Sequence, residues 1–381
     1  MNRLRNDFLL DPSVIFLNHG SFGACPKPVF EAYQRWQLEL ERQPVEFLGR
    51  RIDGLLDEAR AALAAYLNTE RDRLVFVQNA TTGVNIVARS LPLQAGDEIL
   101  TTDHEYGACD YTWGWVCEQT GARYVRVLIP LPVTTHADFV ERVWAGVTPR
   151  TKVIYLSHIT SPTALTFPVQ EICRRAREAG ILTVIDGAHA PGQIPVDLTA
   201  IDADFYTGNL HKWLCAPKGS AFLYARPAYQ AWLVPPTISW GWTPDRTYIT
   251  AQQQQGTRDP AAYLTVPTAI KYQAEHDWDA VRADCHALIR ETRLRVAALT
   301  GLDPIAPDDQ GWYKQMAAMP LPVQPDGWKE FKTRLYDEHC VEAPIIYWGG
   351  RVYIRVSAQG YNTRHDMDRL IDALGMLLSL V

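Results

Sequence analysis

The chain has 381 residues, of which 47% are hydrophobic and 21% are charged, and its formal net charge is −6 at pH 7. A chain of this length is expected to form one large and one small domain. The acidic balance argues against nucleic acid or an anionic membrane surface as a partner, and the lack of a long apolar run argues against a membrane-spanning helix.

The first residues and the cysteines bear on the cellular compartment. The N-terminal sequence leads into only a few apolar residues, which does not fit a secretory signal peptide. The seven cysteines are scattered without Cys-x-x-Cys spacing, a pattern typical of reduced thiols. We therefore expect a cytoplasmic protein.

Two helices are predicted at the start of the chain. The first begins near Pro26 to Pro28, because proline suits the first helical turn. The second carries apolar residues at helical spacing between Ile52 and Tyr66. Residues 1–25, which precede both helices, are interpreted as an N-terminal arm.

Short apolar segments follow, and most are separated by helical stretches such as Val169 to Ala179. This alternation predicts an α/β fold with a mostly parallel, seven-stranded sheet and helices on both faces. In such sheets, ligands bind beyond the carboxyl ends of the strands. The predicted strands are Leu74–Val77, Glu98–Thr102, Tyr124–Ile129, Val153–Leu156, Leu182–Ile185, Phe205–Thr207 and Ala221–Tyr224.

The alternation loosens after about residue 260. The later elements predicted are helices from about Trp278 to Leu299, ending near His339, and from Arg364 to Leu378, with a strand at Val352 to Val356. We divide the chain into the arm, a large domain at residues 26–260 and a smaller α+β C-terminal domain at residues 261–381. The arm is expected to pack near the smaller domain.

Lys212 directly follows His211 between two predicted strands. A lysine buried there is costly while it is charged and unpaired. Covalent use with a carbonyl cofactor, with a pKa lowered by burial, would make the position tolerable. Taken alone, the position is more typical of a surface lysine in a turn, because lysine is rarely buried.

Three further segments lie at the ends of predicted strands. Asn79-Ala80-Thr81-Thr82-Gly83 opens a helix, so it suits a phosphate group or is a simple threonine helix cap. Asp186 either holds a protonated ring nitrogen or caps a turn, and His189 either bonds a phenolic oxygen or is an ordinary buried or surface residue. In His104-Glu105-Tyr106-Gly107, an aromatic ring either stacks on a planar cofactor or packs in the core.

Together these segments resemble one family. Asn79-Ala80-Thr81, Asp186-x-x-His189, His211-Lys212 and Arg355-Val-Ser-x-x-x-Tyr361-Asn362-Thr363 have the order and spacing of class V pyridoxal-phosphate enzymes. The resemblance runs from about Asn18 to the last helix and is nearest to the isopenicillin N epimerase-like branch. It implies the fold of the type I pyridoxal-phosphate transferases. The branch is indicated by Asn18-His19-Gly20-Ser21-Phe22-Gly23, His104-Glu105-Tyr106-Gly107-Ala108, His211-Lys212-Trp213-Leu214-x-Ala216-Pro217-Lys218-Gly219 and Glu342-Ala343-Pro344-Ile345.

The resemblance implies pyridoxal 5′-phosphate (PLP) as cofactor and a role for each matching residue. Lys212 would form the internal aldimine, Asp186 would pair with the pyridine nitrogen, and His189 would contact the phenolic oxygen. Either Tyr106 or His104 would stack on the ring. Phosphate contacts are implied for Ala80, Thr81, Asn209 and His211, and substrate contacts for Asn18, His19 and Arg355, whose guanidinium would clamp the α-carboxylate of an amino acid.

The resemblance also implies a homodimer with shared active sites. Gly256 and Thr257 would reach the phosphate of the cofactor bound by the partner subunit. Asp259-Pro260 is interpreted as a helix cap and first helical residue, which places Thr257 just before a helix start.

Several reactions stay open. The cofactor supplies an electron sink, and the protein selects which bond at Cα breaks. Racemisation or epimerisation, transamination, and β-elimination such as C–S cleavage all begin with removal of the Cα proton by Lys212. A cysteine desulfurase is disfavoured, because the loop from Pro344 to Gly350 before Arg355 contains no cysteine. Trp240 or Trp242 would suit a bulky or apolar substrate side chain.

Two readings from other classes are weaker. A non-enzymatic cofactor-binding protein would be expected to lack Lys212 or Asp186, and both are present. A metal hydrolase built from Asp186, His189 and His211 lacks His-x-x-x-His or a similar ligand spacing. No metal is therefore expected.

Overall fold

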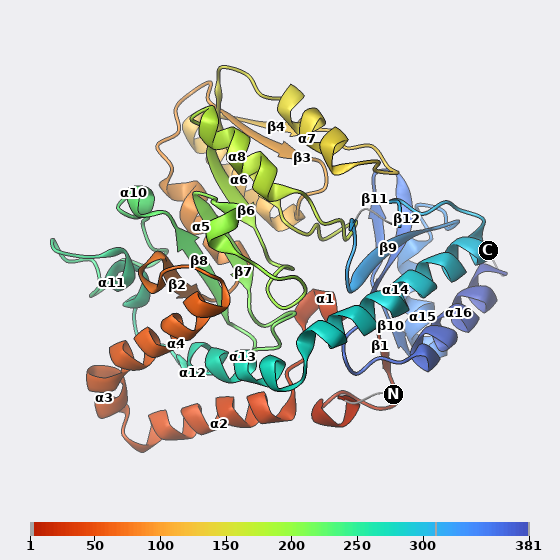
Figure 1. The fold of residues 1–381 in the computed structure, drawn as a ribbon, viewed down its shortest axis with the longest axis horizontal. Helices are drawn as coiled ribbons and strands as arrows, with labels where there is room; N and C mark the ends of the chain where they lie inside the picture. The colour runs from red at the N-terminus through yellow and green to blue at the C-terminus, as the bar shows by residue number, and fades with distance from the viewer. Residues whose placement is uncertain (1–3, 309–310, 380–381) are drawn as a thin grey trace.

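The structure of the protein is a computed structural model that describes residues 4–308 and 311–379. Its centre is a seven-stranded sheet in the order β2-β8-β7-β6-β5-β3-β4 (Figure 1). Only β8 runs antiparallel to its neighbours, so the predicted mostly parallel sheet is confirmed. The strands are β2 (Leu74–Val77), β3 (Glu98–Thr102), β4 (Arg123–Val127), β5 (Thr151–Ser157), β6 (Leu182–Asp186), β7 (Phe205–Asn209) and β8 (Ala221–Ala225).

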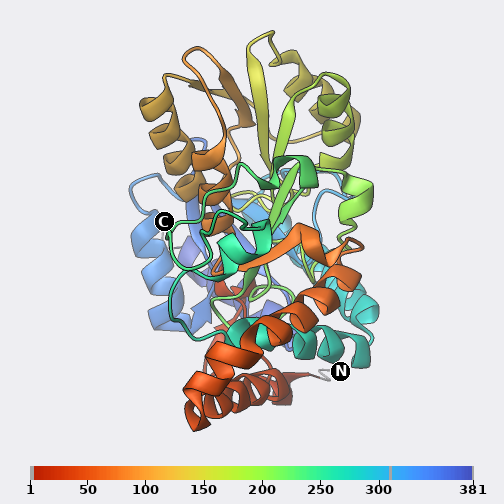
Figure 2. The same ribbon diagram turned by 90° about the vertical axis from the view of Figure 1, so that its left-hand side faces the viewer.

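Helices cover both faces of this sheet, and Figure 2 shows the strands between two helical layers. The helices that precede α14 in the chain are α1 (His19–Phe22), α2 (Lys27–Arg42), α3 (Pro44–Glu46), α4 (Ile52–Tyr66), α5 (Ala80–Ser90), α6 (Gly107–Thr120), α7 (His136–Ala145), α8 (Val169–Glu178), α9 (Leu198–Ile201), α10 (Pro227–Gln230), α11 (Tyr248–Gln253), α12 (Ala261–Leu264) and α13 (Val266–Glu275). Short 3-10 or π turns are η1 (Arg5–Asp7), η2 (Phe47–Arg51) and η3 (Arg71–Arg73).

The alternation of side chains along each strand explains why both faces are buried. In β5, Val153 and Tyr155 join a core cluster with side chains of α5 and α6. Ile154 and Leu156 point to the opposite face and join a cluster with side chains of α4, α7 and α8. A strand buried on both sides is mostly apolar, which is why residues Val153 to Leu156 of β5 form a continuous apolar run rather than an alternating one.

The predicted strand at Tyr124 to Ile129 has different ends in the structure. In the structure, β4 ends at Val127. The Ile129 N–H donates to the Asp103 carboxylate at 2.9 Å instead of continuing the ladder with β3. A side-chain acceptor therefore ends this edge strand two residues early.

A second core forms the smaller part of the molecule, on the right in Figure 1. Its antiparallel sheet has the order β11-β12-β9, and a two-stranded parallel sheet pairs β1 with β10. Helices α14, α15 and α16 pack against these strands and each other. The elements are β1 (Ile15–Phe16), β9 (Met316–Leu321), β10 (Val341–Glu342), β11 (Ile345–Trp348), β12 (Arg351–Ser357), α14 (Trp278–Thr300), α15 (Trp328–His339) and α16 (Arg364–Leu378).

The two cores meet within α14. Trp278 at its start belongs to the main core, whereas Cys285 and Ile289 belong to the second core. Helices α12 and α13, which the sequence-based division places in the smaller domain, pack against α2 and α4. In the N-terminal arm, Ile15 and Leu17 are part of the second core.

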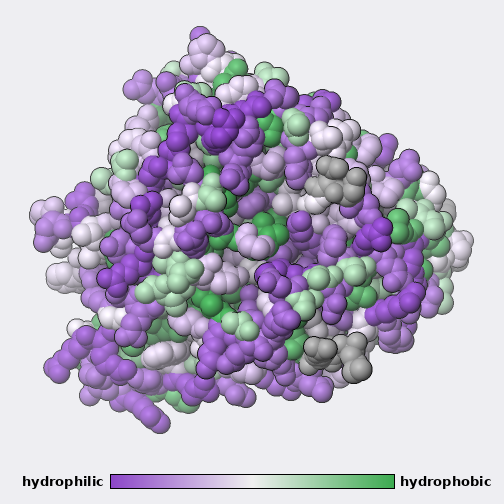
Figure 3. Space-filling view, viewed as in Figure 1, coloured by the Kyte–Doolittle hydropathy of each residue, from purple (hydrophilic) through white to green (hydrophobic). Residues whose placement is uncertain are grey.

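The surface and the thiols add two observations. On the face seen in Figure 3, hydrophilic residues dominate and apolar residues lie between them in small groups. Across the described residues, no helix combines the length and the apolar character needed to cross a membrane. Each of the seven cysteines is a free thiol.

Candidate active site

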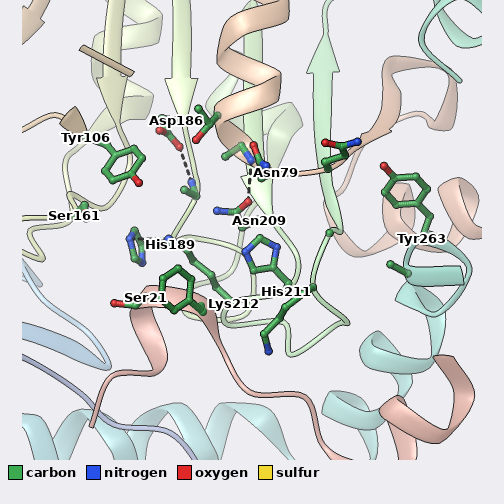
Figure 4. A pocket seen from close by; sticks show the side chains of 18 of the residues that line it. Ser21, Asn79, Tyr106, Ser161, Asp186, His189, Asn209, His211, Lys212 and Tyr263 are labelled. Carbon is green, nitrogen blue, oxygen red and sulfur yellow. Dashed lines mark hydrogen bonds between the residues drawn. The ribbon is translucent and has the colours of Figure 1, made fainter. Parts of the chain in front are cut away.

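A pocket of about 570 Å³ opens at the carboxyl ends of the parallel strands (Figure 4). Ser157, Asp186 and Asn209 are the last residues of β5, β6 and β7, and all three line it. Neighbouring parallel strands end at the same edge of a sheet, so the topology brings these polar side chains together. The pocket lies where the alternating pattern of the sequence predicts a ligand.

Lys212 projects into this pocket from the turn after β7 (Figure 4). Its Nζ lies 3.2 Å from Nε2 of His189. Burial and the charge of Arg355 lower the pKa of Lys212 to about 7, and the Asp186 carboxylate opposes this shift. Of the two interpretations of this lysine, the buried amine with a lowered pKa is the one that agrees with the structure.

The N-terminal arm holds the backbone of the Lys212 turn. Gly23 has φ +69°, and a Cβ atom there would lie 2.0 Å from the carbonyl oxygen of His211. Only glycine allows so close an approach with this backbone conformation. In addition, Nε2 of His19 lies 3.0 Å from the Lys212 carbonyl oxygen, which can only accept a hydrogen bond. The arm therefore fixes the position of the lysine.

Asp186 is a buried carboxylate at the floor of the pocket. It accepts a hydrogen bond from the Ala188 N–H at 2.9 Å, and its other oxygen lies 3.4 Å from the Tyr155 hydroxyl. Within the described residues it has no lysine, arginine or histidine at ion-pair distance. Burial raises its pKa, while these hydrogen bonds and Lys212 oppose the rise. A cationic ligand atom would complete its surroundings.

His189 lies three residues after Asp186 and is buried between two nitrogen partners. Nε1 of Trp213 lies 3.3 Å from its Nδ1, and Lys212 lies at its other ring nitrogen. Burial, reinforced by the charges of Lys212 and Arg355, lowers the pKa of His189 well below its usual value. The ring is therefore neutral at pH 7.

The start of α5 forms another wall of the pocket. Its cap is Asn79, whose side chain accepts the Thr82 N–H at 2.8 Å, so the cap is asparagine and not threonine. The Ala80 N–H donates to Asn209 Oδ1 at 2.8 Å. Thr81 lines the pocket, and its N–H has no partner within the helix at this position. The helix start thus keeps a positive end facing the pocket.

His211 stands beside this helix start. Its Nδ1 lies 3.1 Å from the Ser220 carbonyl oxygen, so Nδ1 carries the proton. Burial lowers its pKa to about 4, which makes the ring neutral at pH 7. An anion beside it would favour the protonated form.

Arg355 reaches the pocket wall from β12 of the smaller domain. Nη1 donates to the carbonyl and the hydroxyl of Ser161 at 2.6 and 3.1 Å, and Nη2 donates to the Ser21 hydroxyl at 3.0 Å. Both serines line the pocket. Burial lowers the pKa of Arg355 to about 10, its Nε has no partner, and no carboxylate among the described residues pairs with it. Arg355 is therefore a buried cation whose charge an anionic ligand would balance.

Six of the expected site residues lie outside the pocket lining: Arg355, described above, and His104, Asn18, His19, Gly256 and Thr257. Tyr106 lines the pocket, whereas His104 is fully buried behind it, with its ring nitrogens bonded to Thr163 and the Ile129 carbonyl. Asn18 donates to Glu342 at 2.8 Å. His19 contacts the Lys212 backbone, and Gly256 and Thr257 line a separate hollow.

Gly256 and Thr257 line a second hollow of about 500 Å³ with Trp240. Both residues are exposed, and Trp240 is 88% exposed, so it does not line the main pocket. The following helix α12 begins at Ala261, one residue later than predicted, and Asp259 accepts the Ala261 N–H at 2.8 Å.

Sequence reasoning did not single out Ser157, Ser161, Ser21 or Trp213 as members of the site. Ser157 directly follows a predicted strand, so its place at a strand end was a usable signal. Ser21 and Trp213 lie inside the motifs that carry the family resemblance. Ser161 has no comparable signal, because its contact with Arg355 spans 194 positions of the chain.

The metal-hydrolase alternative gains no support from the site. In the part of the chain that the structure describes, there is no group of three or more histidine, cysteine, aspartate or glutamate side chains that could hold a metal ion.

Comparisons with known proteins place this site in a family. The profile of the family described as aminotransferase class-V matches residues 23–370. The chain is 36% identical to isopenicillin N epimerase of Amycolatopsis lactamdurans over 97% of its length and 96% of that protein. It is 30% identical to putative L-cysteine desulfhydrase 1 of Oryza sativa subsp. japonica, over 97% of this chain and 84% of that one.

Solved structures share the fold. The cysteine desulfurase CsdA of Escherichia coli matches with a TM-score of 0.81 at 23% identity, over 99% of this chain and 98% of that one. The cystine C-S lyase C-DES matches with a TM-score of 0.82 at 20% identity, over 96% and 98% of the two chains. The protein belongs to the aminotransferase class-V family and is a pyridoxal-phosphate-dependent type of enzyme.

Proposed function

We propose that the protein binds PLP and acts at the α-carbon of an amino acid, as an epimerase or racemase or as an aminotransferase. One observation carries the proposal. A buried amine, Lys212, and a buried carboxylate without an ion-pair partner among the described residues, Asp186, face the same pocket beside the start of a helix.

The chemistry of these groups fits the cofactor. The start of α5 and the Thr81 hydroxyl suit its phosphate. Asp186 suits a protonated ring nitrogen, because a cation there would relieve the cost of burying its charge. Lys212, with its pKa near neutrality, suits covalent attachment to an aldehyde, since the neutral amine is the nucleophile. A pocket of about 570 Å³ is of the size that holds such a ligand.

When bound, PLP supplies an electron sink for the bond that breaks at Cα. The protein then has to remove and return a proton. Lys212 is suited to this task because an amine with a pKa of about 7 both accepts and releases a proton at neutral pH. The arm packs against the backbone of the lysine turn and so holds the amine in place on one side of the pocket.

Arg355 would orient the substrate. Its guanidinium is already held in one plane by Ser161 and Ser21, so little side-chain entropy is lost when a carboxylate binds. A fork of two N–H groups sets the direction of the carboxylate and hence of the Cα–H bond. The lowered pKa of about 10 still leaves it charged at pH 7.

Tyr106 is proposed as the residue that stacks on the cofactor ring. It lines the pocket and is 45% exposed there. His104 is engaged by Thr163 and the Ile129 carbonyl, and its ring packs 4.4 Å from that of Trp348. These contacts keep His104 behind the pocket wall.

β-Elimination is the second candidate, because several relatives at 27 to 30% identity are named L-cysteine desulfhydrases. A persulfide-forming desulfurase is disfavoured. The segment before Arg355 is a β-hairpin of β11 and β12 whose Trp348 is tied to the Asp103 carbonyl at 3.1 Å. Cys340 is exposed at the end of α15 and is not part of the pocket lining.

The active unit is proposed to be a homodimer. Gly256 and Thr257 lie on the surface in a hollow that shares Arg258 and Tyr263 with the rim of the main pocket. A partner subunit seated over this rim would bring its own Thr257 toward the phosphate end.

The free state of all seven cysteines supports the expectation of a reducing compartment such as the cytoplasm.

Borohydride labelling tests the attachment site. The purified protein loaded with PLP should absorb in the visible, lose that band on reduction, and carry the label on Lys212. Lys218 is the matched control, because it also lines the pocket and has a pKa lowered by burial. A label on Lys218 would overturn the assignment.

A panel of L- and D-amino acids separates the candidate reactions. The Cα hydrogen of the remaining substrate should exchange with solvent deuterium, or its removal should show a kinetic isotope effect, whichever of the three outcomes follows. Inversion without keto acid identifies an epimerase or racemase, a keto acid with conversion of the cofactor to its amine form identifies an aminotransferase, and sulfide with pyruvate identifies β-elimination. Product formation with neither exchange nor a kinetic isotope effect at Cα would refute the proposed first step.

A further inference from the structure

Trp213 follows the lysine directly and holds an unusual place beside His189. It is fully buried, and its Nε1 lies 3.3 Å from Nδ1 of His189. The other ring nitrogen, Nε2, lies 3.2 Å from Nζ of Lys212. One histidine ring therefore connects an indole to the reactive amine.

Elementary hydrogen-bond chemistry decides where the proton of this ring sits. An indole N–H can only donate, so Nδ1 of His189 has to accept. The groups facing the ring, Lys212, Arg355 and His211, all disfavour a second proton, as does burial. A neutral imidazole carries one N–H, which leaves the proton on Nε2.

The proton on Nε2 has a consequence for the amine. Nε2–H points at Nζ of Lys212, and only an unprotonated amine has a lone pair to accept it. The opposite tautomer would present a lone pair to Nζ and would favour the ammonium form. The direction of this hydrogen bond agrees with the pKa of about 7 at Lys212.

We propose that Trp213 is a positioning residue that selects the Nε2–H tautomer of His189 and thereby directs a hydrogen-bond donor toward Lys212 Nζ. In the PLP-loaded enzyme the same donor would face the phenolic oxygen of the cofactor, and this second part rests on the proposed function. Trp213 acts through His189 and does not line the pocket itself.

The indole is fixed in the orientation that this role needs. The backbone carbonyl of Trp213 accepts a hydrogen bond from the Gln273 side chain at 2.8 Å in the core. Gly192, with φ +90°, packs so closely that a Cβ atom there would lie 2.3 Å from the Trp213 carbonyl oxygen. The indole ring also packs 5.0 Å from the ring of His19. A backbone fixed by two contacts and a ring packed against His19 keep the indole N–H on His189.

The variant Trp213→Phe distinguishes tautomer selection from a simple role of Trp213 in filling the core. Phenylalanine keeps an aromatic ring at the site and removes only the N–H and one ring of the indole. If Trp213 merely fills space, the variant loses stability and nothing else. If it selects the tautomer, the variant releases His189 to adopt either form.

The tautomer can be measured directly. Full-length protein labelled with 15N in its histidine side chains should show, for His189, a protonated Nε2 and a bare Nδ1. The signals are assigned by their loss in His189→Gln. Trp213→Phe should give a mixture or the reverse tautomer. A wild-type ring protonated on Nδ1 would overturn the proposal, even if the variant failed to fold.

The titration of Lys212 gives a second readout. The rate at which an amine-directed reagent labels Lys212 in the apo protein is followed against pH by mass spectrometry. In Trp213→Phe the midpoint should rise by about 0.5 to 1 pH unit, which corresponds to the worth of one hydrogen bond. At a pH below the midpoint, the fraction of Lys212 in the neutral, reactive form would then be about three- to tenfold smaller, and labelling would slow by the same factor.

Trp312→Phe is the matched control. Trp312 is fully buried, and its Nε1 donates to the Thr134 carbonyl at 3.1 Å, far from Lys212. This variant should lose a comparable hydrogen bond and leave both the His189 tautomer and the Lys212 midpoint unchanged. Unchanged values in a folded Trp213→Phe protein would refute the inference. A failure to bind PLP would instead refute the proposed function, because neither readout needs the cofactor.

Discussion

Replacing Arg355 with lysine should weaken catalysis without emptying the cofactor site. The guanidinium makes three hydrogen bonds through two nitrogens, to Ser161 and Ser21. A lysine ammonium is a single donor centre on a differently shaped stem, so it cannot reach both serines and also present a fork to a carboxylate.

The size of the loss follows from the bonds removed. One charge-assisted hydrogen bond to the substrate carboxylate contributes about 1.5 to 3 kcal/mol, which is a factor of roughly 10 to 150 in kcat/KM. KM should rise because charge and geometry are lost, and kcat should fall because the Cα–H bond is no longer aligned. PLP content per chain should stay the same, since none of the contacts proposed for the cofactor involves Arg355.

Steady-state kinetics with the best substrate of the amino-acid panel provide the assay. Arg351→Lys is the matched control, because Arg351 lies on the same strand and is exposed. Thermal unfolding checks that both variants remain folded. Unchanged kcat/KM in Arg355→Lys would remove the carboxylate clamp, and loss of PLP would show that Arg355 serves the cofactor instead.

Three further outcomes are expected. Asp186→Asn should keep the bond from the Ala188 N–H but lose the charge, so kcat should fall by about 100-fold at full PLP occupancy; a near-normal kcat would exclude the ring-nitrogen role. Lys212→Met should stabilise the apo protein by a few kcal/mol near pH 7. The folded pKa of Lys212, about 7, lies below its ordinary value of 10.5, so the unfolded chain binds more protons between these two pH values. The stability gained by the variant should therefore shrink as the pH rises toward 10.5. A difference in unfolding free energy between the two proteins that stays constant with pH, measured by denaturant unfolding, would contradict this. Mixing Lys212→Ala chains with Thr257→Trp chains should give heterodimers with one intact site, measurable as recovered activity, whereas a fully active monomer would rule out shared sites.

Much of the architecture is encoded locally. A strand covered on both faces is mostly apolar, so β2 and β6 are visible as short, largely apolar segments that end within one residue of their observed limits. The closing helix α16 has its predicted bounds, because its Thr363 forms a capping box with Asp366. Residues at strand ends, such as Asp186, follow from the same pattern and a simple rule of sheet topology.

Contacts across the two cores are encoded nowhere in the local pattern. Arg355 meets Ser21 across 334 positions, and Trp213 meets His189 through a turn and a strand end that only the packed sheet brings together. Choosing Tyr106 over His104 as the residue on the pocket wall also needed the packing of Trp348 against His104. Spacing along the chain determines which face of a helix or strand a side chain occupies. The rotation and approach of one element toward another depend on every contact in the core. These side-chain partners are therefore known only once the chain is folded.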